Sequence, residues 1–296
     1  MIRAGQLGLS PRHMVRLQAQ AQAQAQLQTI RCFSDDSERT PKLEKPCDVV
    51  QGPNLLRTVV HRPSPSLMFL PGLRSLPFWT SVQGDENRVA YGDPIVTSAV
   101  EYLQANVETI RNEYLSVAQE KKLASDYTDT GHQQLHQGKW EWHSYLNKGS
   151  VQGHFAFHFP KTSQILQELR EENLLFEGTP FGFSFFSSLH GNARIQPHTS
   201  PMNLRLRVHL PLIVPKEDPA DQEIKCGIRV GPIARQWKEG KALVLDDAYE
   251  HEVWNETDQL RVVLLVDMWH PDITIEERKE IVKMFQDARQ QGMWSR

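Results

Sequence analysis

Two histidines and an arginine carry the strongest chemical signal in this chain. His198 lies in the polar segment 196–201, His251 lies in the segment 246–254, and Arg261 follows ten residues later in a strand-like run. Two distant histidines on a β framework indicate a shared metal ion, because imidazole is a common metal ligand. The arginine predicts a bound carboxylate, since guanidinium groups bind carboxylates through paired hydrogen bonds. The combination is typical of a non-haem iron oxygenase with a 2-oxo acid cosubstrate.

The ligand pattern departs from the usual one at a single position. Many such oxygenases bind iron through two histidines and a carboxylate that lies two residues after the first histidine. The spacing of His198 and His251 fits, but the residue two positions after His198 is Ser200, a poor iron ligand. Glu250 and Glu252 flank His251, and on a strand such neighbours point to the opposite face. We therefore expect either two histidines and a water, or a carboxylate from elsewhere.

Arg261 has two readings. An arginine that faces the interior of a barrel is costly unless an anion meets it, so Arg261, together with Arg207 and His209, is expected to contact a bound anion. The alternative is an internal salt bridge from Arg261 to Asp267 or Asp247.

The remaining histidines and acids give a weaker signal. Twelve histidines are present, and most of them need no special explanation. We interpret the following residues as packing, surface or structural groups: His154, His158, His190, Asp246, Asp247 and His270.

Hydrophobic periodicity predicts three helices around the β region. Apolar residues recur at spacings of three and four over 97–123, which predicts one amphipathic helix. A second helix is expected over 162–171, with Thr162 or Ser163 as its N-cap. The charged segment 275–290 predicts a helix that closes the chain.

Most of the segment 183–270 has the pattern of β-strands. Apolar residues alternate strictly with polar ones over 203–210, which places one polar set on a single face: Arg205, Arg207 and His209. The run 261–267 likewise places Arg261 and Asp267 on the same face. Short strands with turns between them predict a mainly β fold, a double-stranded β-helix or jelly roll, with flanking α-helices.

Composition narrows the function classes. The chain has 296 residues, of which 39% are hydrophobic and 23% are charged, as in an ordinary globular protein. The net charge of −3 and the lack of a basic stripe give no reason to expect nucleic-acid binding. We expect no transmembrane segment, because no apolar run approaches about 18 residues. Three cysteines without short pairing predict neither a disulfide framework nor a zinc motif.

The N-terminal segment differs from the rest. Residues 1–33 contain four arginines and no acidic residue, which predicts a mitochondrial transit peptide, with a cleavage signal at 31–34. Its removal would take away four positive charges and move the net charge from −3 to about −7. The alternative is a disordered Gln/Ala-rich leader in a cytoplasmic protein. We expect a polar linker over 34–64 and a single catalytic domain over 65–296.

Several long motifs resemble one known family. The run 198–210 is closely similar to the aspartyl/asparaginyl β-hydroxylases, and so are the segments 237–241, 246–255 and 267–271. The resemblance covers roughly residues 68–275.

The resemblance implies a double-stranded β-helix that binds Fe(II) and 2-oxoglutarate and hydroxylates the β-carbon of Asp or Asn side chains. His198 and His251 match the family's iron ligands. Members from animals have Gly where this chain has Ser200, so the lack of a carboxylate ligand is shared.

The resemblance also implies roles for four further residues. Arg261 matches the arginine that binds the distal carboxylate of 2-oxoglutarate, with help from a serine that is Ser187 here. His209 matches a contact to the carboxylate nearer the metal. Arg207 matches an arginine that holds the acidic group of the substrate.

We therefore predict a 2-oxoglutarate-dependent Fe(II) dioxygenase that acts on an Asp/Asn-type side chain of a protein or peptide. Two alternatives stay open: a hydroxylase of a free amino acid or other small anion, and a non-catalytic binding module on the same fold. The secretory-pathway members carry a membrane anchor and a helical repeat region, which this sequence does not show. Their EGF-like substrates are therefore not expected here.

Overall fold

The computed structural model describes part of the chain, and these residues belong to one unit, Leu56–Arg296. The described residues are 63–80, 93–120, 123–127, 135–216 and 223–293. The predicted leader and nearly all of the predicted linker lie outside them, so both remain predictions.

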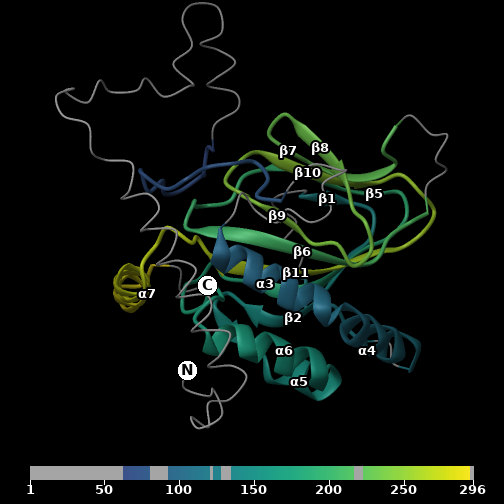
Figure 1. Cartoon of the computed structure of the whole chain (residues 1–296), viewed down its shortest axis with the longest axis horizontal. Coiled ribbons are helices and arrows are strands. Elements are labelled where there is room, and N and C mark those ends of the chain that lie inside the picture. Colours follow the sequence, from purple (N-terminus) through teal and green to yellow (C-terminus); the bar gives the residue numbers. More distant parts are fainter. Residues whose placement is uncertain (1–62, 81–92, 121–122, 128–134, 217–222, 294–296) are drawn as a thin grey trace, which may run out of the picture. The chain divides into compact units, whose positions relative to one another are not determined.

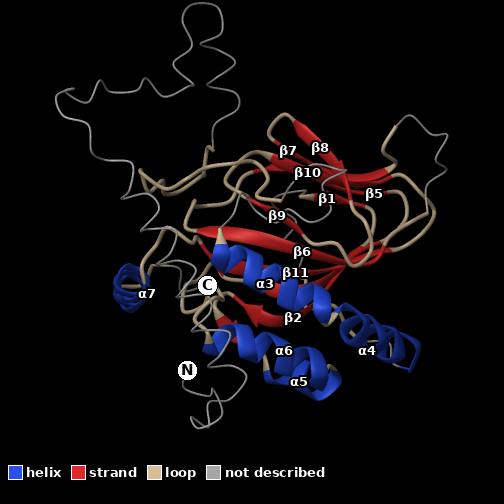
Figure 2. Ribbon diagram, in the orientation of Figure 1, coloured by secondary structure: helices blue, strands red, loops and turns tan. Residues whose placement is uncertain are grey.

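Two antiparallel sheets form the framework (Figures 1 and 2). The first sheet has the strand order β1-β5-β10-β7-β8, and the second has the order β3-β2-β4-β11-β6-β9. From β4 to β11 the chain passes repeatedly from one sheet to the other, as in a jelly roll. This confirms the predicted fold class. The strands are β1 (His136–Gln137), β2 (Trp140–Asn147), β3 (Ser150–Val151), β4 (Ser184–Leu189), β5 (Ala193–His198), β6 (Arg205–Ile213), β7 (Cys226–Val230), β8 (Ile233–Gln236), β9 (Leu243–Leu245), β10 (His251–Asn255) and β11 (Arg261–Trp269).

Side chains of both sheets share one apolar cluster. Ile195 and Val253 from the first sheet pack in the same buried cluster as Leu189 and Val263 from the second. The two sheets therefore face each other across a common core, into which the inward residues of β5, β6, β10 and β11 project.

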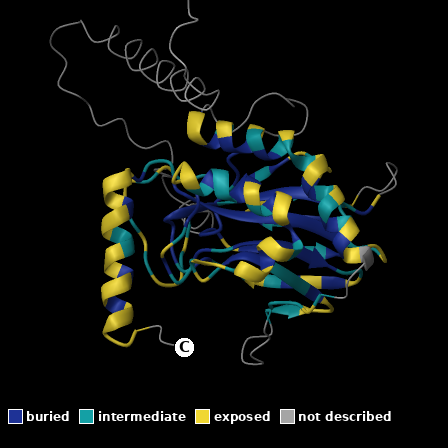
Figure 3. Cartoon of the chain, turned by 90° about the horizontal axis from the view of Figure 1, so that it is seen from below, coloured by how far each residue is buried: buried dark blue, intermediate teal, exposed yellow. Residues whose placement is uncertain are grey.

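Helices cover the other face of the second sheet. Leu206, Val208 and Leu210 pack in a second cluster with the buried faces of the helices, while their polar neighbours on β6 face the opposite side, as the alternation predicted. Figure 3 shows this arrangement as buried strands beneath helices whose outer faces are exposed. The helices of this cluster are α3 (Pro94–Ala105), α4 (Val107–Glu120), α5 (Gly153–His158) and α6 (Pro160–Glu171), whereas α7 (Ile275–Gln290) packs in a different cluster.

The single helix predicted over 97–123 is wrong, because the chain forms α3 and α4 with a break at Asn106. The Asn106 amide donates to the carbonyl of Tyr102 at 2.9 Å. Asparagine competes in this way with the helical hydrogen bonds of the backbone, which favours a helix end.

The predicted cap of the second helix is also wrong. Helix α6 begins earlier, at Pro160, and no side chain of its own caps it. Instead the Glu113 carboxylate of α4 accepts hydrogen bonds from the backbone N–H groups of Lys161 at 2.8 Å and Thr162 at 2.7 Å. A carboxylate at this end also interacts favourably with the helix dipole, and sequence periodicity does not reveal such a tertiary cap.

The C-terminal helix α7 has the bounds predicted from its sequence. Thr274 and Glu277 form a capping box at its start, and Phe285 packs in a third cluster with Trp269 of β11. Among the described residues, no helix is both long enough and apolar enough to cross a membrane.

Candidate active site

The two predicted metal ligands lie side by side at the ends of neighbouring strands. His198 is the last residue of β5 and His251 is the first residue of β10, and the two residues are paired in the antiparallel register. Their ring centroids are 4.1 Å apart. His251 is buried, and His198 is half-buried. Residues 53 positions apart in sequence are thus brought to one point by strand pairing.

Hydrogen bonding fixes which nitrogen of each ring is available. Nδ1 of His198 lies 2.7 Å from the Gln196 carbonyl oxygen, and Nδ1 of His251 lies 2.9 Å from that of Tyr249. A carbonyl oxygen can only accept, so Nδ1 carries the proton in both rings. Each Nε2 is then a lone-pair donor, without a hydrogen-bond partner in the described part of the chain. This is how metal-binding histidines are commonly oriented.

Electrostatics keep both rings neutral. Burial, together with the neighbouring His198, lowers the pKa of His251 to about 3. Burial also lowers the pKa of His198. Neutral imidazole is the form that binds a metal ion, so the pair is ready to act as a ligand at neutral pH.

No carboxylate completes the site. Glu250 and Glu252 both pair with Arg229, at 3.0 Å and 2.6 Å, as expected for residues that point away from His251. The Ser200 hydroxyl donates to the carbonyl of Met202. Within the described ranges, no three His, Cys, Asp or Glu side chains are grouped so that they could hold a metal ion. The arrangement is therefore a pair of histidines.

Arg261 is buried, and no carboxylate among the described residues lies at ion-pair distance from it. It is 1% exposed, and its Nη1 donates to the carbonyl and the hydroxyl of Ser187, at 3.1 and 3.2 Å. Its Nε has no hydrogen-bond partner among the residues that the structure describes, and burial lowers the pKa of Arg261 to about 10. The structure thus brings the predicted pair Arg261 and Ser187 together. It leaves an uncompensated cation, which is costly in a protein interior.

The alternative of an internal salt bridge from Arg261 is wrong. Arg261 and Asp267 share a face of β11 but lie six residues apart, which separates them by about 20 Å along the strand. Asp267 and Asp247 instead pair with Arg205 and Arg207.

His209 lies on β6 between these charged groups. It is 5% exposed, and neither of its ring nitrogens has a hydrogen-bond partner in the described structure. Its pKa is lowered well below the usual value, mainly by burial and then by Arg261, Arg207 and His251. Buried polar atoms are nearly always satisfied in proteins, so the orphaned nitrogens of His209 and Arg261 indicate a place for a polar ligand.

A network of two arginines and two aspartates occupies the other end of β6 and β11. Arg207 and Asp267 are cross-strand partners and form two hydrogen bonds, at 2.8 and 3.0 Å. Arg205 binds Asp247 at 2.7 Å and Asp267 at 2.9 Å, and it also donates to the Phe181 carbonyl. Although burial opposes ionisation, both arginines keep the pKa of Asp247 far below its usual value. We call Arg205, Arg207, Asp247 and Asp267 the paired cluster.

This network was not predicted from the sequence. The alternation of β6 assigned Arg205 to the correct face but gave it no role, and Asp247 was interpreted as structural. The alternating pattern of β6 and the acid on the matching face of β11 were the available signals. Arg207 was predicted to hold a substrate acid, and here two of its three guanidinium nitrogens already face Asp267.

Asp246 and His270 have structural contacts. Asp246 accepts hydrogen bonds from the Ala248 N–H at 3.0 Å and the Ser75 hydroxyl at 3.2 Å. Burial raises the pKa of Asp246 to about 7. His270 contacts the carbonyl of Arg74 at 2.9 Å through Nε2.

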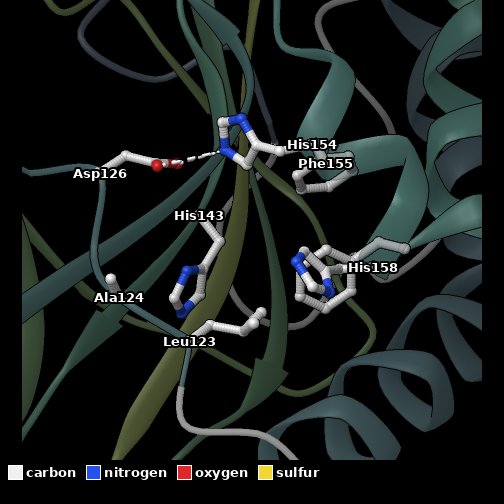
Figure 4. A pocket seen from close by; sticks show the side chains of 8 residues that line it. Leu123, Ala124, Asp126, His143, His154, Phe155 and His158 are labelled. Atoms are coloured by element: carbon white, nitrogen blue, oxygen red, sulfur yellow. Dashed lines mark hydrogen bonds and ion pairs between the residues drawn. The ribbon is translucent and has the colours of Figure 1, made fainter.

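Other described histidines lie away from this site. His190 contacts Glu141 at 2.6 Å. Three others line a separate pocket of about 260 Å³ beside α5: His143, His154 and His158. In this pocket His154 contacts Asp126, as the dashed line in Figure 4 shows.

Comparisons with known proteins agree with this geometry. A family model described as aspartyl/asparaginyl beta-hydroxylase matches residues 104–271. The human aspartyl/asparaginyl beta-hydroxylase is 32% identical over 216 residues, which are 73% of this chain and 26% of that protein. The ornithine lipid ester-linked acyl 2-hydroxylase of Rhizobium tropici is 49% identical over 88 residues, 30% of each chain.

A prolyl hydroxylase from Trichoplax adhaerens shows a weaker structural likeness. It is 11% identical, with a TM-score of 0.38, and the alignment covers 66% of this chain and 98% of that one.

This chain spans about a quarter of the length of the human aspartyl/asparaginyl beta-hydroxylase. The matched family segment includes the two histidines, Arg261 and the paired cluster, and it extends over more than half of the sequence. The chain belongs to the aspartyl/asparaginyl beta-hydroxylase family.

Proposed function

We propose that this protein is an Fe(II)- and 2-oxoglutarate-dependent dioxygenase that hydroxylates an Asp/Asn-type side chain of a protein or peptide. One observation carries the proposal. Two neutral histidines with available Nε2 atoms lie in the same barrel as a buried arginine that has no carboxylate partner in the described ranges. A metal ion and a carboxylate ligand would satisfy both features.

The residues fit these two groups. His198 and His251 would bind iron, and Arg261 with Ser187 would bind the distal carboxylate of 2-oxoglutarate. His209 would contact the carboxylate nearer the metal, where its orphaned nitrogens are available. When bound, iron and 2-oxoglutarate supply the oxidising chemistry, and the protein supplies ligation, orientation and a shielded interior.

The chain's own contribution is preorganisation. The backbone carbonyls of Gln196 and Tyr249 fix the orientation and protonation of the two imidazoles before any metal arrives. Ser187 does the same for Arg261 by accepting from Nη1. Such groups need little rearrangement on binding, which lowers its entropic cost.

The metal and cosubstrate are tested together by an anaerobic titration of the protein with Fe(II) and 2-oxoglutarate. We expect a visible metal-to-ligand charge-transfer band that is absent in His251→Ala and weakened in Arg261→Ala. His190→Ala, which removes a histidine outside the site, is the control and should keep the band. A folded wild-type protein that gives no band and binds no iron would contradict the proposal and favour a non-catalytic binding module.

The substrate is proposed separately. Arg207 is our candidate for binding an acidic group of the substrate. It would bind this group while it keeps its ion pair with Asp267. A free amino acid or another small anion would suit the same residue. The name of the Rhizobium relative also places an acyl chain among the possible targets. Assays of 2-oxoglutarate turnover with acidic peptides, free aspartate and an acyl lipid would separate these classes, because the true substrate should raise succinate formation several-fold.

We also propose that the protein is imported into mitochondria, on the basis of the arginine-rich, acid-free segment 1–33. Fusion of residues 1–64 to a fluorescent protein tests it. Import into mitochondria that is lost when the four arginines are replaced supports the address, and a diffuse cytoplasmic signal refutes it.

A further inference from the structure

Trp237 lies beside the proposed cosubstrate site, immediately after β8. Its side chain is 1% exposed and packs in the cluster between the two sheets. The indole N–H is buried and has no hydrogen-bond partner in the described structure. A buried donor left unsatisfied costs about 1–3 kcal/mol, so this atom is a candidate ligand contact.

The indole ring is stacked against the arginine. The guanidinium carbon of Arg261 lies 4.8 Å from the centroid of the Trp237 ring. The His209 ring is also nearby, with its centroid 6.1 Å from that of Trp237 and an angle of 31° between the planes. A ring face stabilises a desolvated cation. Trp237 is therefore a neighbour of the two residues whose unpartnered nitrogens mark the proposed cosubstrate site, Arg261 and His209.

A second Trp–Arg pair in the molecule shows what is different here. Arg74 lies 5.1 Å from the Trp79 ring, and the indole N–H of Trp79 is also buried without a partner. Arg74, however, binds Asp93 at 2.7 Å and Asp272 at 2.6 Å. An unpartnered indole alone thus does not mark a site. The pair at Arg261 differs because the described residues place no carboxylate at ion-pair distance from this arginine.

We propose that Trp237 is a further binding residue of the cosubstrate site. Its indole N–H donates to the carboxylate that Arg261 binds, and its ring face holds the guanidinium in place. The inference rests on the proposed function. It makes Trp237 a determinant of selectivity for 2-oxo acids that carry a second, distal carboxylate.

The test is calorimetric titration of the full chain with 2-oxoglutarate and with 2-oxobutyrate, which lacks the distal carboxylate. Redox-inert Zn(II) replaces iron. Trp237→Phe keeps a ring face and removes the N–H, so we expect 2-oxoglutarate to bind roughly ten-fold more weakly, with 2-oxobutyrate changed less than two-fold. Trp237→Leu also removes the stacking and should weaken 2-oxoglutarate binding further. Trp79→Phe is the matched control and should change neither affinity.

Two results would overturn the assignment. Equal weakening of both ligands in Trp237→Phe would mean that Trp237 only packs the core, and unchanged 2-oxoglutarate affinity would mean that its N–H is not used. Either result leaves the proposed function intact, whereas a wild-type protein that binds neither 2-oxo acid contradicts both.

A measurement on the wild-type protein does not depend on the folding of any variant. With ¹⁵N-labelled indoles, one N–H resonance should move downfield with 2-oxoglutarate and stay in place with 2-oxobutyrate. No movement of any indole resonance on saturation with 2-oxoglutarate would refute the hydrogen bond.

Discussion

The interior faces of β6 and β11 carry buried arginines of two kinds. In the paired cluster, Arg205 and Arg207 each contact two aspartates. At the other end of β11, Arg261 is as deeply buried as Arg205, and within the described part of the chain its hydrogen bonds go to Ser187. Within one barrel, the same side chain is thus neutralised in one place and left charged in another.

The difference in pairing distinguishes a structural arginine from a ligand-binding one. A buried arginine that is held by aspartates stabilises the strands that carry it, and it needs nothing else. A buried arginine without an anion raises the free energy of the ligand-free protein. Such a site persists most readily when a ligand supplies the anion, so Arg261 indicates the binding site more directly than the more numerous charges of the paired cluster.

The largest expected effect comes from breaking the paired cluster. Asp267→Ala removes the carboxylate that holds Arg205 and Arg207 and that accepts from the Phe183 N–H. Because the buried Arg205 and the half-buried Arg207 both lose a partner, we expect the free energy of unfolding to fall by about 3–5 kcal/mol. Urea denaturation measures the loss. The exposed pair Arg194–Glu256 is the control, and Glu256→Ala should cost less than about 1 kcal/mol.

Asp246 extends the comparison of paired and unpaired charges to an acid. It is buried, and no arginine lies at ion-pair distance from it in the described structure. Burial raises its pKa to about 7, whereas an unfolded aspartate has a pKa near 3.9. The folded protein therefore holds a proton that the unfolded chain releases. This group's contribution is most favourable below about pH 4 and is lost as the pH rises to about 7.

Asp246→Asn measures that contribution, since the amide keeps an acceptor for Ala248. The variant should gain stability relative to wild type between pH 5 and pH 8, on the order of 2–3 kcal/mol. Equal pH profiles of unfolding for the two proteins would show that the Asp246 pKa is not raised.

Replacing the unpaired arginine should have the opposite sign to breaking the paired cluster. In Arg261→Met a buried cation becomes an apolar side chain of similar length, so we expect the ligand-free protein to lose no stability and to gain up to about 2 kcal/mol. Thermal unfolding in the presence of a chelator measures this. A loss comparable to that of Asp267→Ala would mean that Arg261 is a structural residue like Arg205.

The smallest effect concerns the cap that α4 provides to α6. Glu113→Ala leaves the N–H groups of Lys161 and Thr162 without their acceptor, and it should cost about 1 kcal/mol. Glu101→Ala, at an exposed position of α3, is the control. A loss much above 2 kcal/mol would contradict this prediction. It would mean that the Glu113 carboxylate contributes as much to stability as a carboxylate of the paired cluster.

Strand residues were the most predictable part of this molecule. The period-two alternation of β6 and β11 correctly assigned Arg207, His209 and Arg261 to the interior, because one buried face constrains every second residue. The histidine pair followed from residue type and spacing, and the strand register then brought His198 and His251 together.

Contacts that depend on distant segments could not be predicted in the same way. The cap of α6 comes from Glu113, which lies about fifty residues earlier in the chain. The break at Asn106 was missed for a different reason. It depends on one local hydrogen bond, which the spacing of apolar residues does not reveal. Trp237 was visible in a family motif, yet its stacking on Arg261 appears only once β8 and β11 are placed in the two sheets.

The most direct test of this account is calorimetric titration of 2-oxoglutarate into the Zn(II)-loaded wild-type protein, Arg261→Met and Arg207→Lys. We predict binding to the wild type, loss of at least about 100-fold in affinity in Arg261→Met, and a change of only a few-fold in Arg207→Lys, because Arg207 is already neutralised by Asp267. Unchanged affinity in Arg261→Met, with loss of binding in Arg207→Lys, would contradict it and move the anion site into the paired cluster.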